Sequence, residues 1–262
     1  MQLDLSGRHA LVCGATQGIG RAAAIELARL GANVTVLARS IETLKQVVDE
    51  LPRTHATQQH RWQAADMLDT AKLLTAATDA AATEPVQILV NNTGGPPGGS
   101  THTAEGAAFE AAFRQHLLAG QALVQSVLPG MRDSGYGRIV NVISTSVKEP
   151  IPGLGVSNTI RGAVASWAKT LARELAPMGI TVNNVLPGFT ETGRITQLVQ
   201  DRVRSTGKSE DEILASMRSN VPAGRFAQPA EIGGVIAFLC SPAAAYVNGV
   251  NLAVDGGRMQ SM

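Results

Sequence analysis

Three glycines stand between a short apolar run and a helical pattern, in Cys13-Gly14-Ala15-Thr16-Gln17-Gly18-Ile19-Gly20. Glycine lets the backbone turn tightly and approach a phosphate, and the N–H groups that begin a helix attract the anion. A glycine triplet that follows a strand and opens a helix is typical of dinucleotide-binding proteins, whereas a tight turn without ligand is the alternative. The expected cofactor-binding residues of this loop are Gly14, Thr16, Gln17, Gly18, Ile19 and Gly20.

The ends of the next predicted strands bear on the choice of cofactor. An acidic residue after the second strand would bind the ribose of NAD, but the sequence has Ala38-Arg39 there. The planar guanidinium of Arg39 suits the 2′-phosphate of NADP, although a solvated surface arginine is the alternative. Asp66 and Asn92 follow the third and fourth strands, where they could line the site or cap a turn. We expect NADP(H) to be favoured over NAD(H).

Apolar runs alternate with helical patterns along the chain. Such alternation predicts an α/β fold of Rossmann type, a doubly wound parallel sheet of about seven strands with helices on both faces. We expect one domain over residues 1–262. The strands are predicted at 9–13, 33–38, 61–65, 86–91, 138–143, 180–186 and 250–254. The helices are predicted at 19–30, 41–51, 70–82, 105–131, 158–176, 210–219 and 230–239.

The composition excludes several classes of protein. The net charge of +1 gives no reason to expect nucleic acid or a membrane surface as a partner. Cys13 and Cys240 are far apart, each in an apolar run, so we expect buried free thiols and no metal site. No signal peptide or membrane span is evident, so we expect a soluble, cytoplasmic protein.

Further motifs carry a family resemblance. They are Asn91-Asn92-Thr93-Gly94, the strand from Gly137 to Ser144, the segment from Thr181 to Gly188 with Thr192 beyond it, and Val254-Asp255-Gly256-Gly257. Together with the glycine loop, they resemble the short-chain dehydrogenase/reductase family over nearly the whole chain, and within it the β-ketoacyl carrier-protein reductases. The resemblance implies an NAD(P)-dependent oxidoreductase acting on a small or carrier-linked carbonyl substrate, as a homotetramer. It also implies cofactor-binding roles for Asn92, Gly94, Pro187, Gly188 and Thr192, and an active-site serine at Ser144.

The other catalytic residues that the resemblance implies are replaced. A tyrosine should protonate the substrate oxygen, a lysine should assist it and bind the nicotinamide ribose, and a helix asparagine should complete the relay. Ser157, Arg161 and His116 occupy those positions. A serine hydroxyl is far less acidic than a phenol, and arginine stays protonated, although Arg161 can still bind the ribose. Ordinary acid catalysis, typically worth ~10²–10⁴-fold, is therefore missing.

Few other residues could supply a proton. Tyr136 and Tyr246 are each followed four residues later by valine, so no shifted alignment restores the pair. Lys148 is expected to border the cleft, where it could act as an acid or bind an anionic substrate; a surface lysine paired with Glu149 is the alternative. His116 could titrate near neutrality and relay protons, or simply be packed.

Three functions remain open at this point. The first is an NADP-dependent oxidoreductase with a non-standard catalytic set: Ser144, Lys148, Ser157, Arg161 and His116. The second is a cofactor-binding pseudoenzyme that acts as a sensor or scaffold. The third is a different reaction on the same frame, such as a lyase or epimerase step.

The segment 188–221 is expected to cover the substrate. It is polar and interrupted by helix, and in doubly wound folds such a segment lies over the ligand crevice. Its basic residues suit an acidic or carrier-linked substrate, although a solvated helix face is the alternative. They are Arg194, Arg202, Arg204 and Lys208.

Overall fold

Apolar side chains alternate between the two faces of the central strands, which requires a sheet covered on both sides. In β1 (His9–Cys13), Ala10 and Val12 pack into one core, whereas Leu11 and Cys13 pack into the other. The computed structural model describes residues 1–261 and has seven parallel strands in the order β3-β2-β1-β4-β5-β6-β7. This order confirms the predicted doubly wound sheet of Rossmann type.

The predicted elements agree with the observed ones to within a few residues at most boundaries. The strands are β1 (His9–Cys13), β2 (Asn33–Ala38), β3 (His60–Ala64), β4 (Ile88–Asn91), β5 (Gly137–Val142), β6 (Ile180–Pro187) and β7 (Asn251–Val254). The α-helices are α1 (Gly18–Arg29), α2 (Ile41–Glu50), α3 (Thr70–Thr83), α4 (Gly106–Phe113), α5 (Ala119–Asp133), α6 (Gly155–Leu175), α7 (Gly193–Thr206), α8 (Glu210–Ser219) and α9 (Pro229–Cys240). Shorter turns are η1 (Thr101–Thr103), η2 (Arg114–Leu118), η3 (Thr145–Val147), η4 (Ala176–Met178) and η5 (Pro242–Ala244).

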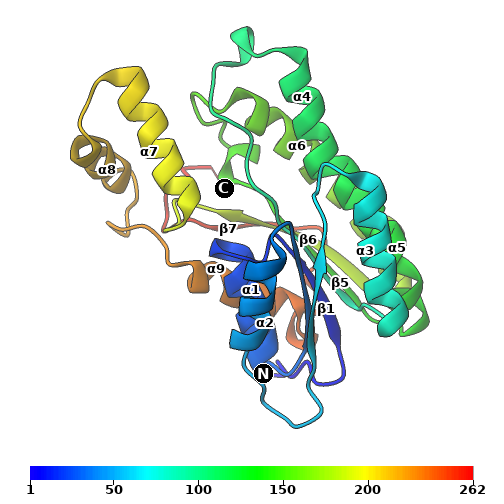
Figure 1. Cartoon of the computed structure of the whole chain (residues 1–262). Coiled ribbons are helices and arrows are strands. Elements are labelled where there is room, and N and C mark those ends of the chain that lie inside the picture. The colour runs from blue at the N-terminus through cyan, green and yellow to red at the C-terminus, as the bar shows by residue number, and fades with distance from the viewer. Residues whose placement is uncertain (262) are drawn as a thin grey trace.

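The helices form two layers. Helices α1, α2 and α9 cover one face of the sheet, and α3, α5 and α6 cover the other (Figure 1). Helices α7 and α8 lie outside both layers, beyond the end of β6. The order of the strands reverses between β1 and β4, so the connections leave these two strands in opposite directions. A crevice opens at the carboxyl ends of the strands at such a switch point.

Two predicted segments differ from the structure. The single helix expected over 105–131 is interrupted by the π-helical turn η2, which contains His116. Such turns inside α-helices are frequent at functional sites. The predicted helices include none between residues 188 and 209, where the structure forms α7. The spacing of Ile195, Val199 and Val203 is that of an apolar helix face and could have predicted this helix. In the structure these residues pack into a small core together with residues of α8.

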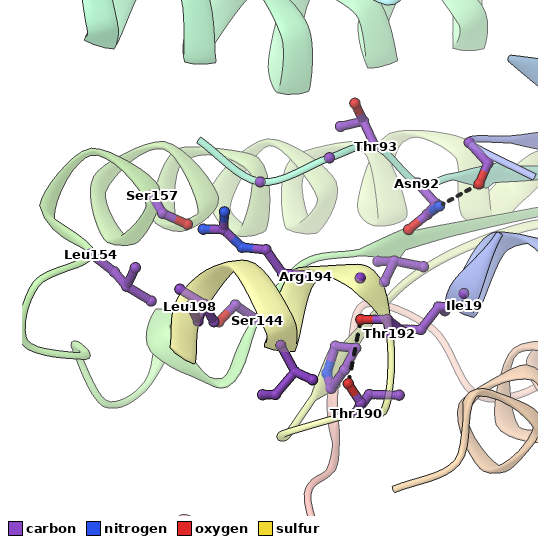
Figure 2. A pocket seen from close by; sticks show the side chains of 18 of the residues that line it. Ile19, Asn92, Thr93, Ser144, Leu154, Ser157, Thr190, Thr192, Arg194 and Leu198 are labelled. Carbon is purple, nitrogen blue, oxygen red and sulfur yellow. Dashed lines mark hydrogen bonds between the residues drawn. The ribbon is translucent and has the colours of Figure 1, made fainter. Parts of the chain in front are cut away.

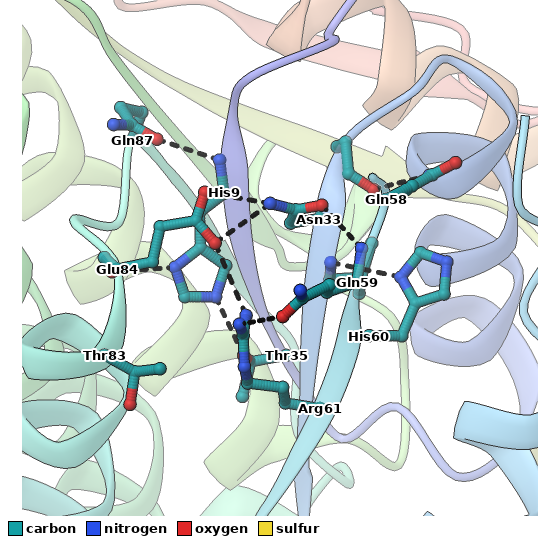
Figure 3. Close-up of polar contacts among 12 residues, drawn as sticks. His9, Asn33, Thr35, Gln58, Gln59, His60, Arg61, Thr83, Glu84 and Gln87 are labelled. Carbon is teal, nitrogen blue, oxygen red and sulfur yellow. Dashed lines mark hydrogen bonds and ion pairs between the residues drawn. The ribbon is translucent and has the colours of Figure 1, made fainter. Parts of the chain in front are cut away.

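A polar network fixes the opposite edge of the sheet (Figure 3). His9 is buried at the start of β1, and its two ring nitrogens lie 2.9 Å from Glu84 O and 2.8 Å from Thr35 Oγ1. Asn33 Nδ2 donates to both carboxylate oxygens of Glu84 at 2.9 Å. The network joins β1, β2 and the end of α3, and it leaves the carboxyl edge to the ligand crevice.

Neither of the two tyrosines lines the cavity at that crevice. Tyr136 directly precedes β5, donates to Cys240 O at 2.6 Å, and is sandwiched between the guanidiniums of Arg8 and Arg138, each 4.0 Å from its ring centre. The side chain of Tyr246 is fully exposed. Tyr136 is therefore part of the packing at the amino edge, and neither phenol is placed to protonate a ligand at the carboxyl edge.

Candidate active site

A cavity of about 1010 Å³ lies at the carboxyl edge of the sheet. It runs from the glycine loop and the end of β2 to the ends of β4, β5 and β6, and then along α6 and α7. Figure 2 shows part of its lining, with Asn92 and Thr93 on one side and Ser144, Ser157, Leu154 and Leu198 on another. The structure thus brings nearly all the predicted site residues into one cavity.

The glycine loop fits a dinucleotide. Gly14 has φ +59°, and a Cβ there would lie 2.7 Å from Asn92 Nδ2, so a larger residue is excluded. A Cβ at Gly20 would lie 2.3 Å from Gly14 O, because α1 packs directly against the loop. Gln17 makes no side-chain cap on α1, so the first N–H groups of the helix remain available to a ligand. The lining contains Gly14, Thr16, Gln17, Gly18 and Ile19, whereas Gly20 lies behind them.

The residues that follow the next strands support the glycine loop and line the part of the cavity beside it. Asn92 Nδ2 donates to Cys13 O at 3.3 Å and to Gly14 O at 3.2 Å, which ties β4 to the glycine loop. Arg39 is largely exposed, and its Nη1 lies 3.8 Å from Asp66 Oδ2. Both line the cavity, as does Gly94. No hydrogen bond is described for the guanidinium of Arg39, so only its exposed ion pair with Asp66 competes with a bound anion.

The end of β6 closes the opposite wall. Pro187, Gly188 and Thr192 line the cavity, and Thr192 Oγ1 donates to Thr190 O at 3.3 Å (Figure 2). A Cβ at Gly18 would lie 3.0 Å from Thr192 Cγ2, so the segment after β6 comes directly beside the glycine loop. Dinucleotide and substrate portions of a ligand would therefore share one continuous space.

Ser144 directly follows β5 and caps the turn η3. Its Oγ accepts from the backbone N–H of Ser146 at 3.1 Å. That contact uses an acceptor lone pair and leaves the hydroxyl proton free. Ser144 also lines the cavity, so this proton can be donated to a ligand oxygen.

Ser157 and Arg161 lie one turn apart on α6, on the same face of the helix. Arg161 Nε donates to Ser157 Oγ at 3.3 Å, and Nη1 donates to the carbonyls of Val142 and Ile143 at 3.1 and 2.8 Å. Burial, and then the charge of Arg194, lower the pKa of Arg161 to about 10. The guanidinium has five N–H donors, and these contacts leave both donors of Nη2 without a described partner.

Lys148 does not reach the cavity. Its side chain is exposed and is not part of the lining, so the expectation that it borders the cleft is wrong. Thr145 before Lys148 and Ile151 after it line the cavity, whereas the side chain of Lys148 itself is directed to solvent, which was not evident from the sequence. The alternative pairing with Glu149 is absent among residues 1–261, because Glu149 accepts from the backbone N–H groups of Gln260 and Ser261.

His116 is buried in the π-helical turn beside the cavity, not in its lining. Burial, and then the charges of Arg161 and Arg194, lower the pKa of His116 to about 3. The imidazole is therefore neutral near pH 7. Of the two alternatives for His116, the structure agrees with the packed side chain and not with titration near neutrality. The sequence could not reveal this shift, because both arginines approach from distant segments.

Several lining residues were not expected from the sequence. Gln115 Nε2 donates to Thr93 Oγ1 at 2.8 Å. Arg194, identified only as part of a basic segment, donates to Pro96 O at 2.7 Å and reaches from α7 toward Ser157 (Figure 2). Arg258 follows the C-terminal Asp255-Gly256-Gly257 signature and also lines the cavity. Within the described residues there is no cluster of side chains suited to a metal ion, nor a helix able to span a membrane.

Comparison with known proteins decides the family. Residues 14–258 match the family described as enoyl-(acyl carrier protein) reductase. A putative ketoacyl reductase of Streptomyces coelicolor is 34% identical over 250 residues, which cover 95% of each chain. The chain belongs to the short-chain dehydrogenase/reductase family. The family resemblance in the sequence is therefore confirmed.

Two further proteins are similar over nearly the whole chain. NADPH-dependent reductase BacG of Bacillus subtilis is 28% identical over 268 residues, covering 98% of this chain and 100% of BacG. The structure of L-sorbose reductase from Gluconobacter frateurii, in complex with NADPH and L-sorbose, superposes with a TM-score of 0.91 at 26% identity and covers 100% of both chains.

The buried His116 predicts a pH dependence of stability. Its pKa is lowered on folding, so below pH ~6.5 the unfolded chain binds a proton that the folded chain does not bind until about pH 3. As the pH is lowered from ~6.5, the contribution of His116 should therefore reduce the free energy of unfolding by up to about 1.4 kcal/mol per pH unit. In urea titrations between pH 6 and 4, His116→Asn should lose stability less steeply than the wild type. The exposed His102→Asn is the control, and equal slopes for all three proteins would refute the buried, neutral imidazole.

Proposed function

We propose that this protein is an NADPH-dependent reductase of carbonyl compounds, with a catalytic set that lacks the tyrosine and lysine of its family. One observation carries the proposal: a single cavity joins the glycine cradle and Arg39 at one end to Ser144, Ser157 and Arg161 at the other. A pseudoenzyme would not require hydroxyl and guanidinium donors to converge beside the cofactor cradle.

The cofactor would lie along the carboxyl edge of the sheet. The glycine loop and the first turn of α1 would bind the pyrophosphate, with Asp66, Asn92 and Gly94 lining the adenosine side and the middle. Arg39 would bind the 2′-phosphate, and Pro187, Gly188 and Thr192 would flank the nicotinamide. NADPH is named for BacG and for the L-sorbose reductase complex, and this supports the preference for NADP(H).

When bound, NADPH supplies hydride to the substrate carbon. The hydroxyls of Ser144 and Ser157 and the free Nη2 donors of Arg161 would bind the substrate oxygen and stabilise the negative charge that develops on it. Donors held in place before the reaction lower the barrier without reorganisation. Arg161 would retain its proton, because even its lowered pKa of about 10 lies well above neutrality. The substrate oxygen would then take its proton from solvent through a serine hydroxyl.

Segment 188–221 would cover the substrate, since α7 contributes Arg194, Ile195 and Leu198 to the cavity wall. The ketoacyl reductases among the relatives support a 3-oxoacyl-like carbonyl group as the reacting centre. The single domain over 1–262 and the homotetramer expected from the family stay predictions.

Arg39 provides the test of cofactor choice. Arg39→Ala should raise the Kd of NADPH roughly 10- to 100-fold, since charge-assisted hydrogen bonds contribute ~1.5–3 kcal/mol, and should leave the Kd of NADH within about 2-fold. Calorimetric titration measures both constants. Arg53→Ala, an exposed arginine outside the cavity, is the control. An equal rise in the Kd values of NADPH and NADH would show that Arg39 does not recognise the 2′-phosphate.

Arg161 provides the test of the catalytic set. Arg161→Gln should lower kcat roughly 100-fold with a panel of 3-oxo esters, which is typical for loss of one donor to a developing oxyanion. Lys148→Ala should stay within about 2-fold of the wild type, because Lys148 is exposed outside the cavity. NADPH binding by each variant reports whether the fold is intact. A wild-type protein that binds NADPH and reduces no member of an oxo acid and oxo ester panel would instead be a non-catalytic binder.

A further inference from the structure

Basic side chains line the part of the cavity next to Ser144. Arg202 of α7 and Arg258 both line the cavity, as do Thr145 and Ser205. Arg258 Nη1 donates to Thr145 Oγ1 at 3.2 Å, and its guanidinium lies 4.7 Å from the ring centre of Phe189. Because Thr145 directly follows Ser144, the Arg258 guanidinium is close to the proposed reacting centre.

No described carboxylate forms an ion pair with these two guanidiniums, although Glu149 is close enough to Arg258 that this charge, after hydrogen bonds from Ser261 and Gln260, contributes to lowering the pKa of Glu149. Neither Arg202 nor Arg258 takes part in any of the ion pairs of residues 1–261. Asp201, the acidic residue in this part of the lining, pairs with Arg204 instead. The buried Nε of Arg258 has no hydrogen-bond partner among the described residues. Polar and charged groups in such a position require a partner, and a ligand can provide it.

The two arginines approach each other from two segments. Phe189, over whose ring Arg258 lies, packs against the small core that contains Val199 of α7, and α7 also carries Arg202. Burial, and then the charge of Arg258, lower the pKa of Arg202. Like charges held together in a partly desolvated cavity raise the free energy of the empty protein. A bound anion between them would remove that repulsion, and guanidiniums are suited to planar, bidentate recognition of a carboxylate.

We propose that Arg202 and Arg258 form a carboxylate subsite, so that the substrate is a small oxo acid whose reducible group lies beside Ser144. This proposal rests on the proposed reductase function. Phe189, Leu198, Leu154 and Ile151 line the same region and would contact the carbon skeleton of such an acid.

The position of the subsite favours a carboxylate on the substrate itself. The phosphate of a carrier-linked substrate lies at the far end of a long flexible arm, away from the reacting carbonyl. The phosphates of the cofactor already have the glycine loop and Arg39 as proposed partners. An anion beside Ser144 must therefore be attached to the substrate within a few bonds of the reacting carbon.

The basic residues of this segment divide into two groups. Arg194 and Arg202 line the cavity, whereas Arg204 is largely exposed and paired with Asp201, and Lys208 is exposed. Arg204 therefore offers a matched control, since it lies on the same helix as Arg202 but outside the proposed subsite.

The experiment compares matched substrates. A panel of 2-oxo and 3-oxo acids and their methyl esters is assayed with NADPH on the wild type, Arg202→Gln/Arg258→Gln and Arg204→Gln. The wild type and Arg204→Gln should prefer an acid over its ester in kcat/KM, and the double variant should lose this preference by roughly 100-fold. A wild type without preference for the acids, or a double variant with the wild-type preference, would overturn the subsite.

Calorimetry separates this proposal from the reductase function and from cofactor binding. If neither acids nor esters are reduced, the reductase function fails, and titration of the NADPH-loaded protein with the same acids decides the subsite. Acid binding by the wild type that is lost in the double variant would support the subsite, and absence of acid binding would overturn it. A double variant whose Kd for NADPH rises as much as its Kd for the acids would assign the arginines to the cofactor and also overturn it.

Discussion

The carbonyl groups at the end of β5 hold a buried positive charge, and the candidate active site is arranged around it. Arg161 donates to the carbonyls of Val142 and Ile143 and to Ser157, and no carboxylate is paired with it among the described residues. Burial, and then this charge and that of Arg194, keep the neighbouring His116 neutral. A buried charge without a counter-ion is costly unless hydrogen bonds and a ligand compensate. These contacts fix the guanidinium beside the point where Ser144 leaves the sheet.

This arrangement suggests how the proposed reduction could proceed without the catalytic tyrosine that the family resemblance implies. A tyrosine assists reduction by giving up a proton, whereas Arg161 and two serine hydroxyls would stabilise charge and leave the proton to solvent. Stabilisation of a developing oxyanion by fixed donors is often the largest single contribution to catalysis. The same chemistry is consistent with an acidic substrate, because further guanidiniums from α7 and the C-terminal segment line the cavity beside it.

The sequence predicted the sheet and the cofactor cradle because both depend on local patterns. Apolar alternation and the glycine spacing identify β1 and α1, and in a parallel sheet Asn92, Ser144 and Pro187 must then reach the same edge. The exposure of Lys148 and the protonation state of His116 could not be predicted in the same way, because both depend on tertiary contacts. The side chain of Lys148 is exposed outside the cavity, and Arg161 and Arg194 approach His116 from α6 and α7. Arg258 reaches Thr145 across 113 residues of sequence, which no local pattern reveals.

The pH profile of kcat with saturating NADPH shows whether fixed donors or an ordinary acid act at the substrate oxygen. No group proposed to act at the substrate oxygen titrates near neutrality, since the pKa of Arg161 is about 10 and that of the adjacent His116 is about 3. If fixed donors stabilise the oxyanion, the profile is level from pH ~6 to ~9 and declines only as Arg161 begins to lose its proton. A one-proton decline with an apparent pKa between ~6 and ~8 would reveal an ordinary acid at the site and contradict the role of Arg161 and the serines.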